Sequence, residues 1–157
     1  MRDAPPPREP SRLTPPAKLA LALRVWLSFA RVRAGVRRTP LPDYVVRLGR
    51  SRRRPPRRRA PQLLSLAVHR TLSLGPGRPS CLIRSLVLFD LLRSQGDPAE
   101  LVIGLPLTPV DKDAHAWVEV DGRDVGPPPG RDGHEPLARF PDDRRNPLPG
   151  VVEHDDR

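Results

Sequence analysis

Residues 80–93 constrain the fold of this chain more than any other segment. They have the length of a helix and are apolar almost all the way round. A helix of that kind has to be buried, so we expect the rest of the fold to wrap around it. Glycine and proline at 75–79 break the chain before it, Ser80 is a good N-cap, and Gly96 ends it.

Cys81, the only cysteine in the chain, falls in the first turn of this helix. The first-turn N–H groups have no partner inside the helix, and the helix dipole places partial positive charge there. A thiolate at that point is stabilised and made more reactive, and the same N–H groups can hold a developing oxyanion. The alternative is a small buried hydrophobic side chain, and Cys81 alone does not decide between the two.

The composition favours one small cytoplasmic domain. The chain has 157 residues, of which 23 are proline, so the foldable part is shorter than the chain and its core is modest. A single cysteine excludes an internal disulfide and gives no cluster of metal ligands, so we expect no metal site. No phosphate-cradling glycine loop is present, so we expect no cofactor either. We also expect no secretory signal and no transmembrane segment, which together predict a cytoplasmic protein.

The chain divides by composition into five regions. We predict a disordered lead-in over residues 1–12, a helical region over 13–49 and a basic Arg/Pro linker over 50–60. A folded core over 61–126 and a Pro/Asp/Arg-rich, disordered tail over 127–157 follow, the tail lightly pinned by Leu137 and Phe140. Within the helical region, apolar residues recur at helical spacing and predict a helix docked on the core: Leu19, Leu23, Trp26, Leu27 and Ala30. A membrane-surface helix is the alternative, but arginine and leucine are not segregated by face.

The net charge of +10 raises the hypothesis of a nucleic-acid-binding protein, with the linker as its basic patch. The linker contains no aromatic side chain on which bases would stack, so we expect no specific nucleic-acid partner. A solvated tether is the plainer interpretation.

The core pattern predicts a second helix over 61–74, the buried helix, and then a small antiparallel sheet. Residues 99–105 indicate a buried strand, and 114–120 alternate so that His115, Trp117 and Glu119 share one face. Asp121 and Gly122 predict a two-residue hairpin, so 123–125 return antiparallel. A cysteine at the start of a buried helix, followed by a strand and a hairpin strand with histidine, is the order found in papain-like and transglutaminase-like enzymes. In such a pair the histidine takes the thiol proton and later protonates the leaving amine.

The blocks at 81–88, 91–93, 101–104 and 115–123 resemble the B2 proteins of bacterial lasso-peptide biosynthesis. These are transglutaminase-like cysteine proteases, similar to the C-terminal domain of the microcin J25 processing protein. The resemblance implies an α+β, papain/transglutaminase-like fold, with the Cys81 helix packed on a small antiparallel sheet and N-terminal helices on one flank. It implies Cys81 as nucleophile and His115 as general base in leader removal from a ribosomally made precursor peptide. The implied partners are a B1-type leader-recognition protein and a cyclase that acts downstream. Arg84 and Ser85 match the family pattern without a role that we can assign from the sequence.

The acidic third member of such a triad is missing. The predicted hairpin pairs Val120 with Arg123, so an acid that orients His115 belongs near 126–128, where none occurs. Asp124 lies four pairs along the ladder, roughly 13 Å away at strand spacing, and Asp132 would have to fold back over the proline run. The sequence therefore leaves a non-catalytic maturation scaffold on the same fold as the alternative to a peptidase. Trp117 is expected either to line the substrate cleft or to be a buried packing residue.

Overall fold

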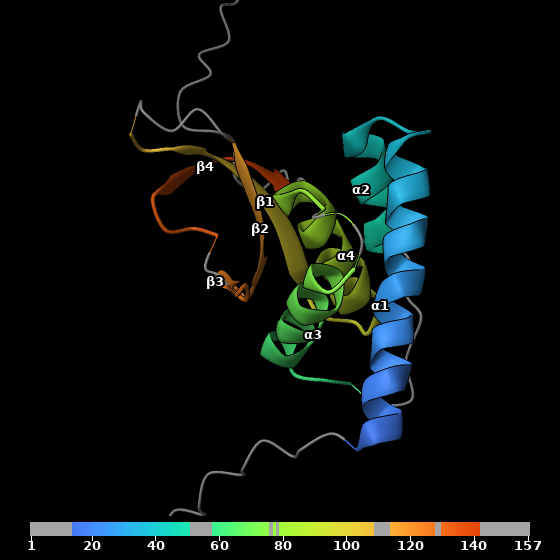
Figure 1. Ribbon diagram of the computed structural model, residues 1–157. Coiled ribbons are helices and arrows are strands. Elements are labelled where there is room, and N and C mark those ends of the chain that lie inside the picture. Colours follow the sequence, from blue (N-terminus) through green and yellow to red (C-terminus); the bar gives the residue numbers. More distant parts are fainter. Residues whose placement is uncertain are drawn as a thin grey trace, which may run out of the picture.

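The computed structural model describes residues 14–50, 58–75, 77, 79–108, 114–127 and 130–141. These residues form an α+β fold in which helices lie on one side of an antiparallel sheet (Figure 1). The helices are α1 (Pro15–Val36), α2 (Leu41–Arg50), α3 (Pro61–Ser73) and α4 (Cys81–Ser94). The strands are β1 (Ala99–Pro106), β2 (His115–Val120), β3 (Arg123–Asp124) and β4 (His134–Phe140). The predicted lead-in over 1–12 and most of the predicted linker lie outside the described residues.

Helix α4 is the centre of the molecule, as its apolar sequence predicts. Every residue from Ser85 to Leu92 is buried. The helix packs against β1 and β2 on one side and against α1, α2 and α3 on the others (Figure 1). Each fully buried leucine or phenylalanine contributes about 1.5–3 kcal/mol through removal from water. The exception is the first turn, where Cys81 to Arg84 are only partly buried, so this end of the helix reaches the surface.

Helix α1 docks on α4, but the predicted docking face is wrong. The exposed fractions of Leu19, Leu23 and Leu27 are 73%, 58% and 58%. The residues that turn inward are Leu21, Val25, Ser28 and Val32. A polar anchor explains the choice: the buried carboxylate of Asp90 on α4 accepts hydrogen bonds from Ser28 Oγ at 2.6 Å and Arg31 Nη1 at 3.0 Å. Since an unpaired buried carboxylate is costly, the face that carries its donors is the one that docks.

The sheet has the strand order β3-β2-β1-β4. The hairpin between β2 and β3 has the predicted register, with Val120 opposite Arg123 and Glu119 opposite Asp124. Both turn residues have positive φ, 52° at Asp121 and 71° at Gly122, as a tight turn between twisted strands requires.

Strand β4 corrects the prediction of a disordered tail over 127–157. Residues 134–140 pair antiparallel with β1, so the folded core continues well past residue 126. Ion pairs replace the missing apolar anchors: Arg139 Nη1 donates to Glu119 at 2.7 Å and to Glu100 at 3.2 Å. Phe140 packs against the core, whereas Leu137 is exposed.

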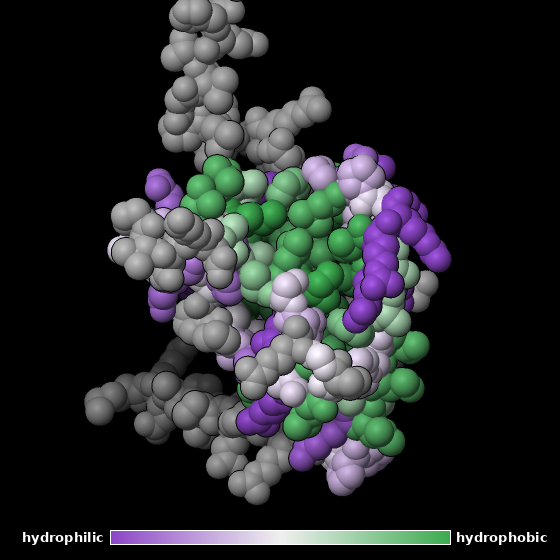
Figure 2. Space-filling view, turned by 45° about the horizontal axis from the view of Figure 1, so that its top comes forward, coloured by the Kyte–Doolittle hydropathy of each residue, from purple (hydrophilic) through white to green (hydrophobic). Residues whose placement is uncertain are grey.

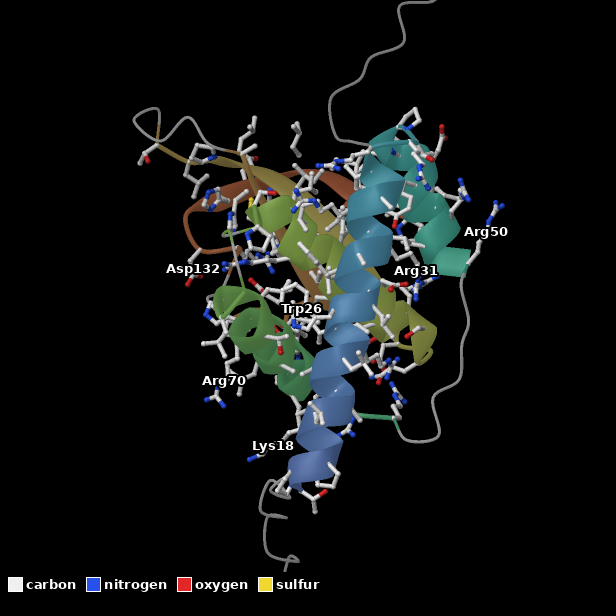
Figure 3. All side chains as sticks on the ribbon, turned by 45° about the vertical axis from the view of Figure 1, so that its right-hand side comes forward. Lys18, Trp26, Arg31, Arg50, Arg70 and Asp132 are labelled. Atoms are coloured by element: carbon white, nitrogen blue, oxygen red, sulfur yellow. The ribbon has the colours of Figure 1, made fainter. Side chains whose placement is uncertain are left out.

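The surface is strongly basic in places and apolar in others. Lys18, Arg50 and Arg70 extend away from the body of the protein (Figure 3). The face shown in Figure 2 has a broad hydrophobic centre bordered by hydrophilic side chains. Across the residues that the structure describes, none of the helices combines the length and hydropathy needed to cross a membrane.

Candidate active site

The helix start that carries Cys81 is formed as predicted. Ser80 is the N-cap of α4, and its hydroxyl accepts a hydrogen bond from the Ile83 N–H at 3.4 Å. The Arg84 N–H bonds to the Ser80 carbonyl. The N–H groups of Cys81 and Leu82 precede the first helical bond and so have no intrahelical acceptor. Cys81 itself is a free, partly buried thiol.

A side-chain hydrogen bond fastens this helix to the strand of His115. Ser85 Oγ, one turn along α4, donates to the Ala116 carbonyl at 2.8 Å, and the bond is buried. Strand β2 is held on its other edge by β1, where His115 pairs with Gly104. Ser85, which sequence analysis left without a role, therefore links the cysteine helix to the residue next to the histidine.

Cys81 and His115 line one open pocket of about 170 Å³. The pocket lies between the first turns of α4, the start of β2 and the middle of α3. Its lining residues are Ser65, Val68, His69, Cys81, Arg84, Ser85, Leu88, His115, Ala116, Trp117, Val118, Gly126, Pro127 and Gly130. The two predicted site residues, which are far apart in sequence, are thus brought to the same cavity.

The environment of His115 favours its neutral form. Partial burial lowers the pKa of the imidazole, and the neighbouring His134 lowers it further. The centroids of these two rings are 5.1 Å apart. The carboxylate of Asp124 opposes both effects and raises the pKa of His115. A neutral imidazole is the form that accepts a proton from a thiol.

The segment after β3 lacks an acid at the expected place, in agreement with the sequence. Gly126 and Pro127 line the pocket where an orienting carboxylate was expected, and residue 128 lies outside the described residues. The carboxylate of Asp124 is engaged elsewhere. It accepts hydrogen bonds from the N–H groups of Gly126 (2.8 Å), Gly130 (2.6 Å) and Arg131 (3.0 Å). Asp124 therefore fixes this segment against the pocket and acts on His115 through its charge.

Gly130 packs closely against this site, whereas Asp132 lies away from it. A Cβ at Gly130 would lie 2.3 Å from Cβ of Trp117 and 3.3 Å from Cδ2 of His115, so only glycine permits this approach. Asp132 does not line the pocket: it is exposed at the edge of the molecule (Figure 3), where its carbonyl contacts Nδ1 of His134 at 3.0 Å.

A buried polar network supports the Trp117 side of the pocket. Trp117 is only 3% exposed, as expected of a buried packing residue, and it also lines the pocket. Its indole Nε1 donates to Glu119 Oε1 at 2.9 Å, and Glu119 Oε2 accepts from Arg139 at 2.7 Å. Sequence analysis missed this network. The one available signal was an acid in the middle of an apolar strand, and its cation comes from a segment that was predicted to be disordered.

Among the residues that the structure describes, no group of three or more His, Cys, Asp or Glu side chains is placed to bind a metal ion. The side chains that line the pocket offer a chemistry of their own. The pocket contains a thiol at a helix start, an imidazole whose pKa is lowered, and first-turn N–H groups beside the thiol.

The family comparison agrees with this arrangement. The family model described as the transglutaminase-like superfamily matches residues 21–139, which include β1 to β3, β4 as far as Arg139, and both site residues. No curated protein and no solved structure matches the chain. The match covers well over half of the sequence, and we conclude that the chain belongs to the transglutaminase-like superfamily.

Proposed function

We propose that the protein is a cysteine peptidase that removes the leader from a ribosomally synthesised lasso-peptide precursor. The observation that carries this proposal is the shared pocket, in which Cys81 at a helix start and His115 on the adjoining strand line one cavity. The superfamily supports cysteine chemistry, and the sequence blocks around both residues support the narrower substrate class.

The proposed reaction uses these groups in a fixed order. The Cys81 thiol gives its proton to His115, and the sulfur attacks the carbonyl carbon at the leader–core junction. The N–H groups of Cys81 and Leu82 stabilise the oxyanion that forms. The amine leaves with the proton from His115, and a water molecule, deprotonated by His115, then hydrolyses the thioester.

The charge of Asp124 favours the imidazolium that forms in the first step, because it raises the pKa of His115. It does so without bonding to the ring, since both of its oxygens hold backbone N–H groups. Losing the orienting acid of a serine triad costs about 10⁴-fold in rate. We therefore expect turnover that is slow for a cysteine peptidase.

A B1-type leader-recognition protein is the proposed partner that presents the leader, and a cyclase is the proposed consumer of the product. The decisive assay mixes the purified protein with its neighbouring leader-binding protein and precursor, and follows leader release by mass spectrometry. We expect release from the unmodified protein and none from Cys81→Ala.

The two pocket histidines provide a matched control. His115→Asn should abolish release, whereas His69→Asn changes an imidazole that lines the same pocket from α3 and should leave most of it. No release from the folded, unmodified protein, with partner and precursor present, would contradict the peptidase proposal. A non-catalytic scaffold would then be favoured, because the described lining of the pocket contains no carboxylate to orient His115.

A further inference from the structure

Arg84 is placed to act in the same pocket as Cys81. It lies three residues further along α4, and residues at that spacing share one face of a helix. Both side chains line the pocket. Neither the sequence nor the mechanism above gives this arginine a role.

The Arg84 side chain has an unsatisfied hydrogen-bond donor. Its Nε atom is buried without a partner, and no other buried side-chain nitrogen or oxygen in the described parts of the chain is in that state. Burying a polar group without a partner costs about 1–3 kcal/mol, so such a group is expected to have a partner in the working protein.

The charges around the pocket point to an anion as that partner. Its described lining contains Arg84 and two histidines but neither aspartate nor glutamate. The nearby Asp124 is satisfied by three backbone N–H groups, and Glu119 by Trp117 and Arg139. Both of these acids are thus already bonded, which leaves Arg84 as a cation available to a ligand.

We propose that Arg84 binds a carboxylate of the substrate next to the bond that Cys81 attacks. As a statement about a substrate, this rests on the proposed peptidase function; as a statement about an anion subsite, it stands on the pocket alone. A guanidinium binds a carboxylate through two parallel N–H···O bonds, which gives both strength and orientation. The pocket volume of about 170 Å³ is far larger than a single water molecule needs, so there is room for a carboxylate group.

The test compares alkylation of Cys81 by iodoacetate and iodoacetamide. Each reagent forms a bond from sulfur to its methylene carbon as iodide leaves, and the two differ in charge at nearly equal size. The ratio of their rate constants cancels any effect of a substitution on the thiol itself. We expect the iodoacetate/iodoacetamide ratio to fall about tenfold in Arg84→Gln, as the loss of a charge-assisted hydrogen bond implies. Arg84→Lys, which keeps the positive charge but cannot form two parallel hydrogen bonds to a carboxylate, should give an intermediate ratio.

Arg50→Gln is the matched control. It removes the same charge from an exposed arginine at the end of α2, which points away from the body of the protein (Figure 3). The ratio should be unchanged in this variant. An unchanged ratio in Arg84→Gln would overturn the proposal, as would an equal fall in Arg50→Gln. Failure of both reagents to alkylate Cys81 would also overturn it, because the pocket would then be closed to small acids.

Protection of the unmodified protein identifies the source of the carboxylate and needs no variant to fold. N-acetyl-aspartyl amide offers a side-chain carboxylate, N-acetylalanine offers a terminal one, and N-acetylalanine amide is the neutral control. The proposal expects one of the two acids to slow alkylation by iodoacetamide more than the amide does, and equal protection by all three would refute it. A charge-dependent ratio without leader release would retain the subsite and reject the peptidase. Leader release with an unchanged ratio would do the reverse.

Discussion

Replacing Arg139 with methionine is expected to lower the free energy of unfolding by about 3 kcal/mol. Glu119 is fully buried, and Arg139 is the only cation bonded to it in the described structure. Without Arg139, the carboxylate keeps a single donor, the indole N–H of Trp117. Removing one partner of a buried ion pair costs about 3–5 kcal/mol. We take the lower end because the Arg139 side chain is itself 38% exposed, so water can partly replace it.

The contact of Arg139 with Glu100 adds little to this figure. Both side chains are more than a third exposed, and such pairs contribute about 0–1 kcal/mol. Urea unfolding followed by circular dichroism measures the loss directly, provided the slope with denaturant is unchanged. Arg131→Met, which removes an exposed arginine just before β4, is the control and should change stability by no more than about 0.5 kcal/mol.

A double-mutant cycle isolates the ion pair. In a Glu119→Gln background no buried charge is left without a partner when Arg139 is removed, so Arg139→Met should cost at least about 1 kcal/mol less than it does alone. A loss below about 0.5 kcal/mol in the single variant would show that β4 does not stabilise the buried acid. Equal losses in both backgrounds would show that packing, and not charge, is what Arg139 supplies.

Three further predictions concern the pocket. Gly130→Ala should reduce leader release at least tenfold, because a methyl group 2.3 Å from Cβ of Trp117 must displace the segment; unchanged release with unchanged stability would contradict this. The NMR titration midpoint of His115 should lie below its ordinary value of about 6.5, and His134→Gln should raise it by removing a like charge. Because the neutral imidazole is the active form, leader release should be lost as pH falls through that midpoint. The lowered pKa should therefore let release continue to lower pH than an unperturbed imidazole would allow. A midpoint at or above 6.5 would show that burial and His134 do not lower the pKa of His115. Ser85→Ala should lower the free energy of unfolding by about 1–3 kcal/mol in urea titration, since it leaves a buried carbonyl without its donor, and a change below about 0.5 kcal/mol would contradict that role.

The parts of the fold that sequence analysis predicted correctly are those in which local signals agree with tertiary structure. The Cys81 helix has a cap, an apolar body and a stop, so its position, burial and central place were all predictable. The hairpin follows from Asp121 and Gly122, whose positive φ values fix the register. The shared pocket of Cys81 and His115 required the family resemblance in addition, because spacing alone does not bring a helix start to a particular strand.

The parts that were missed depend on contacts between distant residues. The inward face of α1 is selected by Asp90, a buried acid on another helix, and the hydrophobic pattern of α1 alone favoured the opposite face. Strand β4 contains Pro136 and few apolar residues, so local propensity argued against it. Its Arg139 bonds to Glu119 on β2, a contact between segments far apart in the sequence. The unbonded Nε of Arg84 has no counterpart in any sequence pattern.

Pro136, which argued against a strand at β4, also affects how readily the protein aggregates at high concentration. β4 is the last strand of the sheet in the described residues, and Pro136 has no N–H with which to pair an incoming chain. Glu135 and Arg139 place charges of both signs along the same strand, and the register shifts between Ile103 and Gly104. Each of these features discourages edge-to-edge association, so this border of the sheet is expected to resist aggregation even though Leu105, Leu107 and Leu137 are exposed there.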